Sequence, residues 1–128
     1  MAADALEVGR RLVELCRQGK NLEAVDTLYD KNIVSVDAHG DEHMPARMEG
    51  IDKIRGKNQW WLDNHQIHSA EVKGPYPHGD RFIVWMRYDI TPTSGPYQGK
   101  RMQVEEAGLY TVRDGKFVHE EFFYHMGE

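Results

Sequence analysis

Hydrophobic positions in the first half of the chain recur with the spacing of α-helices. The first stripe ends before Gly19, a residue typical of helix ends, and consists of Ala5, Val8, Leu12, Leu15 and Cys16. Asn21 is a favourable cap for a second short helix, whose predicted inner face consists of Leu22, Val25, Leu28 and Tyr29. A third helix is predicted after Gly50, with an inner side of Ile51, Ile54, Asn58, Trp61, Leu62 and His65.

The second half of the chain changes to the alternation of hydrophobic and polar residues that is typical of β-strands. Strands are predicted at 67–74, 81–91, 100–112 and 116–126, separated by the turn sequences "GPYPHGD", "PTSGPYQG" and "RDG". A short strand, "NIVSVDAHG", precedes the third helix, and "GDEHMPARMEG" between them is predicted to be a loop. Helices followed by hairpin-linked strands predict an α+β fold, in which about three helices pack on the concave face of a curved antiparallel sheet.

Both faces of the predicted strand "RFIVWMRYDI" carry large apolar side chains. One face runs from Phe82 to Ile90 at every second position, whereas Ile83 and Trp85 begin the other face. A sheet covered by helices on one side normally exposes the other side to water. The apolar residues on this second face therefore predict a homodimer that forms through the sheet.

Composition narrows the class of protein further. A chain of 128 residues is expected to form one domain over 1–128, and its single cysteine, Cys16, excludes an intrachain disulfide. The net charge of −5 and the lack of a dense Lys and Arg cluster argue against nucleic-acid binding. The sequence contains no signal-peptide pattern and no apolar run of about 18 residues, so a soluble cytoplasmic protein without a membrane partner is expected.

The order of these elements, together with three sequence segments, resembles the nuclear transport factor 2-like superfamily and, within it, the SnoaL-like branch named after a polyketide cyclase. The segments are "GKNLEAVDTLYDKNIVSVD", "EGIDKIRGKNQWW" and "GLYTVRDGKFVHEEFFY". The resemblance covers roughly residues 5–126. The superfamily includes ketosteroid isomerases and limonene-epoxide hydrolase. The resemblance implies a cone-shaped fold with a pocket at its wide end, and dimers that commonly form through the sheet.

The resemblance also implies candidate catalytic residues. Asp37, in "IVSVDA", falls on the position of the general base in isomerase-like members. The position of their second acid is Gly108, and Leu12 replaces their tyrosine. Glu106 lies two residues before Gly108 on the same strand face, where it is a candidate substitute. A proton-transfer site would use Asp37 as the base and Glu106 or His65 as its partner.

In two pairs of adjacent glutamates, the alternation of the strand does not tell which member faces the predicted pocket. Glu105 and Glu106 must point to opposite faces of their strand, and so must Glu120 and Glu121. The predicted lining for a small apolar or cyclic ligand is aromatic and consists of Trp61, Trp85, Tyr88, Tyr110, Phe122 and Tyr124.

Metal and cofactor sites are not expected. His119 and His125 stand roughly 20 Å apart on a strand, too far to share one ion. The loop with Asp37, His39, Asp41 and His43 has suitable ligand types but matches no established spacing. No phosphate-binding loop or dinucleotide-binding pattern is present. The readings that remain are a cofactor-free proton-transfer enzyme, a non-catalytic carrier of small molecules, and a dimeric interaction module.

Overall fold

The structure is a computed structural model that describes residues 3–42 and 44–125, with side chains from residue 5 onward. The helices are α1 (Ala3–Arg17), α2 (Asn21–Leu28) and α3 (Ile51–Asp63). The strands are β1 (Tyr29–Val36), β2 (Arg47–Glu49), β3 (His65–His78), β4 (Arg81–Pro92), β5 (Met102–Arg113) and β6 (Lys116–Tyr124). His43 of the candidate metal loop and Met126 of the last predicted strand lie outside these residues. Within the described part, none of the helices is long and apolar enough to cross a membrane.

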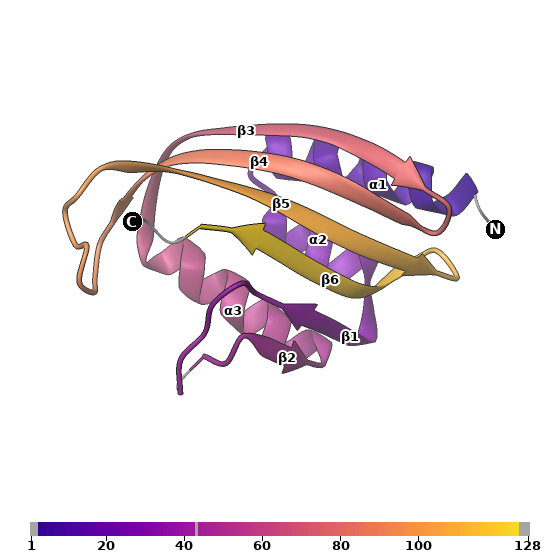
Figure 1. The fold of residues 1–128 in the computed structure, drawn as a ribbon, viewed down its shortest axis with the longest axis horizontal. Coiled ribbons are helices and arrows are strands. Elements are labelled where there is room, and N and C mark those ends of the chain that lie inside the picture. The colour runs from indigo at the N-terminus through magenta and orange to yellow at the C-terminus, as the bar shows by residue number, and fades with distance from the viewer. Residues whose placement is uncertain (1–2, 43, 126–128) are drawn as a thin grey trace.

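One curved sheet contains all the described strands in the order β2-β1-β6-β5-β4-β3. Figure 1 shows α1 and α2 behind this sheet and α3 beside β1 and β2. The predicted α+β fold, with helices against the concave face, is confirmed. The sheet is mixed rather than fully antiparallel, because β6 returns between β5 and β1 and pairs in parallel with β1.

Apolar side chains between the helices and the sheet form the core. The helical stripe of α1 packs against β3, and Gly9 permits this approach because an added Cβ would lie 2.9 Å from the Cβ of Pro75. The largest apolar side chains with the least exposure are Phe82, Phe117, Leu28, Ile33 and Ile54. Phe117 and Phe82 lie 5.6 Å apart between ring centroids, so the core joins the last strand to the middle of the sheet.

Several predicted boundaries differ from the structure. Tyr29 begins β1 instead of ending a helix, and Asn21 is the first residue of α2, which Lys20 precedes without a side-chain cap. The predicted loop contains β2, which pairs with β1. The predicted turn "GPYPHGD" mostly continues β3, because Tyr76 and the residues after it pair with β4. Pairing between strands extends these elements beyond what local propensity indicates.

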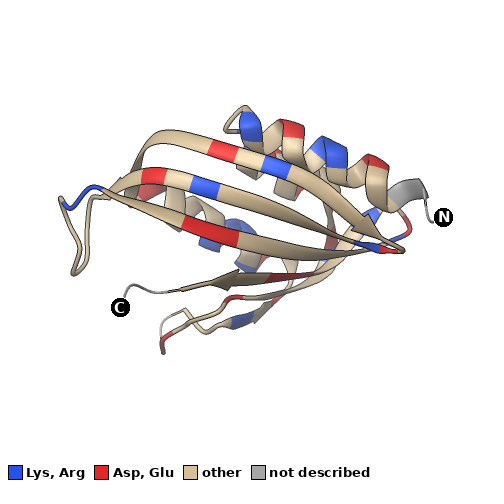
Figure 2. Ribbon diagram, turned by 45° about the horizontal axis from the view of Figure 1, so that its top comes forward, with Lys and Arg blue, Asp and Glu red and all other residues tan. Residues whose placement is uncertain are grey.

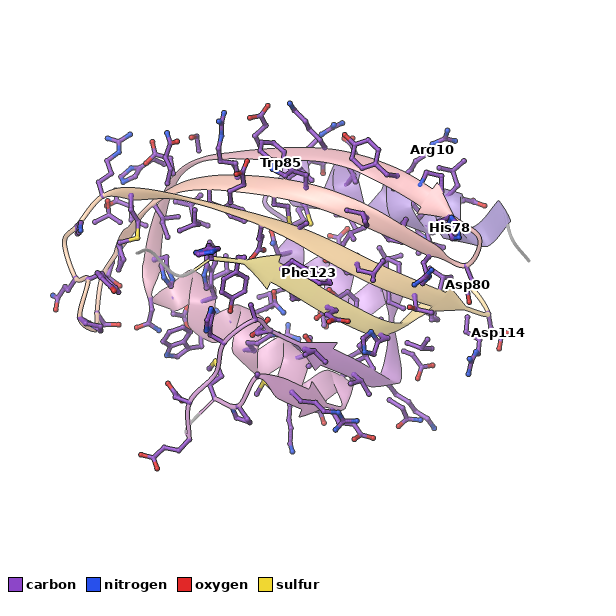
Figure 3. All side chains as sticks on the ribbon, viewed as in Figure 1. Arg10, His78, Asp80, Trp85, Asp114 and Phe123 are labelled. Atoms are coloured by element: carbon purple, nitrogen blue, oxygen red, sulfur yellow. The ribbon has the colours of Figure 1, made fainter. Side chains whose placement is uncertain are left out.

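The outer face of the sheet, turned away from α1 and α2, carries charged and apolar side chains together. Figure 2 shows blue and red bands on neighbouring strands of this face. The Arg87 guanidinium lies 2.8 Å from Glu71, and the Trp85 indole donates a 2.7 Å hydrogen bond to Glu105. Trp85 and Phe123 are labelled on this side in Figure 3. The exposed apolar residues here include Tyr76, Ile83 and Phe123.

Candidate functional site

A hollow of about 580 Å³ opens at the ends of β1 and β6. Because these two strands are parallel, their carboxyl ends lie at the same edge of the sheet. The hollow is lined by Val36, Asp37, Ala38, Glu121, Phe122, Phe123, Tyr124 and His125. It combines aromatic rings with a carboxylate, as small-molecule sites commonly do.

Asp37 lies directly after β1 and pairs with Lys57 of α3. The Lys57 Nζ is 3.4 Å from each carboxylate oxygen of Asp37 and donates a 2.8 Å hydrogen bond to the Ser35 hydroxyl. The same ammonium lies 5.4 Å from the ring centre of Phe122. The side chains of Lys57 and Asp37 are 12% and 21% exposed, so this ion pair is largely shielded from water.

Glu120 lies deeper, on β6, and is only 1% exposed. The hydroxyl of Tyr29 donates a 2.5 Å hydrogen bond to its Oε2, across 91 residues of sequence. The other oxygen, Oε1, has no hydrogen-bond partner among the described residues. Burial raises the pKa of Glu120, while the charge of Lys57 and the hydroxyls of Tyr29 and Ser35 oppose that rise. A raised pKa favours the protonated carboxyl, which suits a site with one unpartnered oxygen.

Glu106 of β5 stands opposite Tyr124 of β6, which lines the hollow. Burial, and after it the negative charge of Asp37, raise the pKa of Glu106 from 4.5 to about 7. The ammonium of Lys57 partly opposes this rise. A carboxyl with a pKa near neutrality can both hold and release a proton at physiological pH, as a general acid or base requires.

The strand pairing shows which glutamate of each adjacent pair faces the helices. Glu106 pairs with Met86, a core residue, and Glu120 is 1% exposed, so both glutamates face the helices. Glu105 faces outward, where it accepts the hydrogen bond from Trp85, and Glu121 lies beside Val36 at the rim of the hollow. The inner face of the sheet therefore gathers the buried Glu120 and the half-buried Glu106 next to the Asp37–Lys57 pair.

The predicted aromatic lining divides between the hollow and the core. Phe122 and Tyr124 line the hollow, and the ring of His39 lies 5.7 Å from that of Tyr124. Tyr110 stacks on Phe82 at 5.1 Å within the core. Tyr88 is also buried, on the same side of the sheet, and donates a hydrogen bond to the sulfur of Met86.

Three predicted site residues lie apart from the residues that line the hollow. Trp61, near the end of α3, stacks on His65 at 4.6 Å, and the His65 Nδ1 is 2.7 Å from the Trp61 carbonyl oxygen. Trp85 projects from the outer face, which corrects its predicted place among the lining residues. The alternation in β4 placed Trp85 opposite to Phe82 from the start, so its outward position follows from the strand period.

Sequence reasoning missed Lys57, Ser35 and Tyr29 as parts of the site. Lys57 follows Ile54 by three positions and precedes Trp61 by four, so it lies within the apolar stripe of α3. A lysine inside such a stripe is a signal that was available in the sequence. No comparable signal exists for Tyr29, because its contact with Glu120 depends on the parallel pairing of β1 and β6.

At Gly108, where the resemblance places a second acid, neighbouring side chains leave no room for a side chain. A Cβ at this position would lie 2.9 Å from the Tyr110 ring and 3.1 Å from the Phe122 ring. Those two rings occupy the space that an acidic side chain would need. Glu106, the candidate substitute, lies two residues earlier on the same face.

The candidate metal loop does not assemble a ligand set in the part of the chain that the structure describes. No three or more His, Cys, Asp or Glu side chains among these residues lie close enough together to hold an ion. Asp37 is directed to Lys57 instead.

Comparisons with known proteins agree with this architecture. The sequence profile of the SnoaL-like domain matches residues 3–124. A protein from Mesorhizobium loti, provisionally named a SnoaL-like polyketide cyclase, is 36% identical, with a TM-score of 0.84 over 92% of this chain and 97% of its own. No protein of curated function shows significant similarity to the chain.

Two more distant structures share the fold alone. A provisionally named isomerase from Bacillus subtilis is 18% identical, with a TM-score of 0.74 over 96% of this chain and 87% of its own. A protein with a cystatin-like fold from Xanthomonas campestris is 10% identical, with a TM-score of 0.75 over 95% of this chain and 91% of its own.

Proposed function

The chain belongs to the SnoaL-like domain family, and we propose that it is a cofactor-free enzyme that moves a proton within a small cyclic or ketide-like substrate. The observation that carries this proposal is the placement of two carboxyl groups: Asp37 lines the hollow, and Glu106 lies opposite Tyr124, which also lines it. Burial and the nearby charge of Asp37 raise the pKa of Glu106 to about 7. Two carboxyl groups with different environments can divide the roles of base and acid between them.

The proposed reaction begins with the carboxylate of Asp37 at the mouth of the hollow. Asp37 removes a proton from the carbon next to a substrate carbonyl, and the electron pair of that C–H bond forms the enolate. Asp37 or the protonated Glu106 then returns a proton to a different carbon. Phe122 and Tyr124 supply apolar surface for the ring of the substrate. The Mesorhizobium loti neighbour has the provisional name of a SnoaL-like polyketide cyclase, which supports this substrate class, and also the name of a carbohydrate phosphatase, which does not.

The test is exchange of substrate protons with deuterium in heavy water, followed by NMR on a panel of cyclic ketones and 1,3-diketones. Wild-type protein is expected to accelerate exchange next to the carbonyl, and Asp37→Asn to slow it about 100-fold or more. Glu106→Gln is expected to remove the change of rate that occurs near pH 7 in the wild type. Glu105→Gln, on the outer face, is the matched control. Full exchange activity in Asp37→Asn would contradict the assignment of the base.

A second candidate function is that of a non-catalytic carrier of small apolar molecules. Gly108 at the position of the second acid favours this function, and so does the pairing of Asp37 with Lys57. A carrier predicts tight binding of a panel member without exchange, and Asp37→Asn would then change the affinity by no more than a few-fold. The same exchange experiment, combined with calorimetric titration, separates the two functions.

We further propose that the outer face of the sheet pairs with a second copy of the chain. Tyr76, Ile83 and Phe123 are large, apolar and exposed there, and charges of both signs lie beside them. A face with both signs of charge can complement itself about a two-fold axis. The expected mass in solution is twice the 14.8 kDa of one chain, and Ile83→Glu is expected to return it to that of one chain.

A further inference from the structure

We propose that Lys57 is a catalytic residue that binds the carbonyl oxygen of the substrate and stabilises the negative charge that develops on it. This inference rests on the proposed proton transfer, and it narrows the substrate class to compounds whose carbonyl oxygen becomes an enolate oxygen. Neither the family resemblance nor the predicted site contained this lysine. The position of its side chain within the carboxyl cluster is the basis of the proposal.

The surroundings of Lys57 are unusual for a lysine on a helix surface. Its helix stripe directs it towards the sheet, and its side chain is 12% exposed. A lysine that serves only solubility would extend into water, as the exposed Lys53 does one turn earlier. Instead, the ammonium lies among a hydroxyl, a carboxylate and the Phe122 ring.

The ammonium is not tightly held by its counter-ion. Both oxygens of Asp37 are 3.4 Å away, whereas a close charge-assisted hydrogen bond is roughly 2.7–2.9 Å long. The shorter contact of 2.8 Å goes to Ser35, which is neutral. Lys57 contacts two of the side chains that line the hollow, Asp37 and Phe122. A substrate oxygen placed beside Asp37 at hydrogen-bond distance from Nζ would gain a closer contact than the carboxylate has. The arrangement leaves the charge of Lys57 available to a ligand.

The balance of charge during the reaction favours the same role. Burial keeps Glu120 protonated to higher pH, and Glu106 is partly protonated near neutrality, so Asp37 is the anion that Lys57 faces at the start. When Asp37 accepts the proton from carbon, its O–H bond forms and its negative charge is lost. The C–H electron pair becomes the C=C bond of the enolate, and the carbonyl π electrons move to oxygen. The negative charge thus passes from Asp37 to the enolate oxygen, and Lys57 faces one anion before and after the transfer.

A purely structural role for Lys57, as the partner that fixes Asp37, makes a different prediction. A lysine that only fixes Asp37 would not contact the oxygen of a bound ligand and would favour the ionised form of that ligand little. A probe with an ionisable oxygen therefore distinguishes the two roles without any turnover. 4-Nitrophenol suits this purpose, because it ionises near neutral pH, has a flat ring for Phe122 and Tyr124, and absorbs visible light only as the phenolate.

The experiment is a spectrophotometric titration of 4-nitrophenol bound to wild type, Lys57→Met, Lys57→Arg and the control Lys53→Met. In wild type and Lys53→Met the bound probe is expected to ionise at lower pH than the free probe, with phenolate bound about tenfold more tightly than phenol. Lys57→Met is expected to abolish this preference, and Lys57→Arg to keep part of it because the charge remains. Circular dichroism establishes that each variant is folded. If Lys57→Met does not fold, the partial phenolate preference expected of Lys57→Arg still tests the role of Lys57.

The outcomes also separate this inference from the proposed function. A phenolate preference that depends on Lys57, in a protein without deuterium exchange, supports the oxyanion site and overturns the proton-transfer reaction. Exchange that is normal in Lys57→Met overturns the role of Lys57 and leaves the reaction in place. Wild-type protein that binds phenol and phenolate equally, or binds neither, overturns the role of Lys57 as well.

Discussion

Glu105 and Glu106 are neighbours in the chain, yet the two faces of β5 give them opposite properties. Glu105 lies on the outer face, exposed to water, with its carboxylate hydrogen-bonded to Trp85. Glu106 lies on the inner face, where burial and the charge of Asp37 raise its pKa to about 7. The residue type is the same, so the difference comes entirely from the number of water molecules and charges around each carboxyl.

The same contrast extends to whole clusters on the two faces. On the outer face, Arg87 and Glu71 form an ion pair whose side chains are 49% and 44% exposed, and Arg101, which is 64% exposed, pairs with the less exposed Asp89. On the inner face, Lys57, Asp37 and Glu120 are mostly shielded, and one oxygen of Glu120 has no hydrogen-bond partner within the described part of the chain. Exposed pairs contribute little to stability because water screens them. Shielded groups interact strongly, and their protonation then depends on one another.

The largest effect is expected from removing the charge of Glu106. The folded carboxyl holds its proton up to about pH 7, whereas the unfolded one releases it near pH 4.5, so its contribution to stability is lost as the pH rises between these values. Glu106→Gln is therefore expected to stabilise the protein at pH 8 by about 2–3 kcal/mol and to change little at pH 4. Urea unfolding across this pH range measures the effect.

Glu105→Gln is the matched control for this experiment, since it makes the same chemical change one residue earlier. Its free energy of unfolding is expected to follow the pH dependence of the wild type. Glu120 remains in both variants, and its raised pKa contributes with the same sign, so the curve for Glu106→Gln becomes shallower rather than flat. Identical curves for the two variants would show that Glu106 is not shielded in solution.

An intermediate effect is expected from the hydrogen bond between Tyr29 and Glu120. Tyr29→Phe removes the hydroxyl donor from Oε2 of the buried Glu120, which typically costs about 1–3 kcal/mol. Trp85→Phe removes an exposed hydrogen bond to Glu105 and is expected to cost less. Thermal unfolding of both variants at pH 6 compares the two faces directly. Equal losses would remove the distinction between them.

The smallest effect is expected from Arg101→Ala on the outer face. The Arg101 guanidinium donates hydrogen bonds of 3.0 and 2.8 Å to Asp89 and lowers the pKa of that carboxyl. Both groups are in contact with water, so stability is expected to change by less than about 1 kcal/mol. The difference should decrease further in 1 M salt, measured by urea unfolding. A large loss that persists in salt would indicate that a second copy of the chain covers this pair.

The periods of the sequence predicted the fold class because they reflect burial directly. The α1 stripe and the alternation of β4 each place apolar residues on one side, and such residues must meet in a common core. Asp37 was predicted as a site residue from the family resemblance, and in the structure it lines the hollow. Its negative charge contributes to the raised pKa of Glu106. Trp85 was misplaced because its size outweighed the alternation that put it on the outer face.

The sequence by itself determined the fold class, most of the helices and strands, and the presence of acidic side chains near the end of β1. The tertiary structure decided which of them meet. The parallel return of β6 beside β1 brings Tyr29 to Glu120, and the packing of α3 brings Lys57 to Asp37. Such contacts join residues that are 20 to 91 positions apart. Local patterns carry no information about pairings between distant segments, because those depend on how the complete sheet closes around its core.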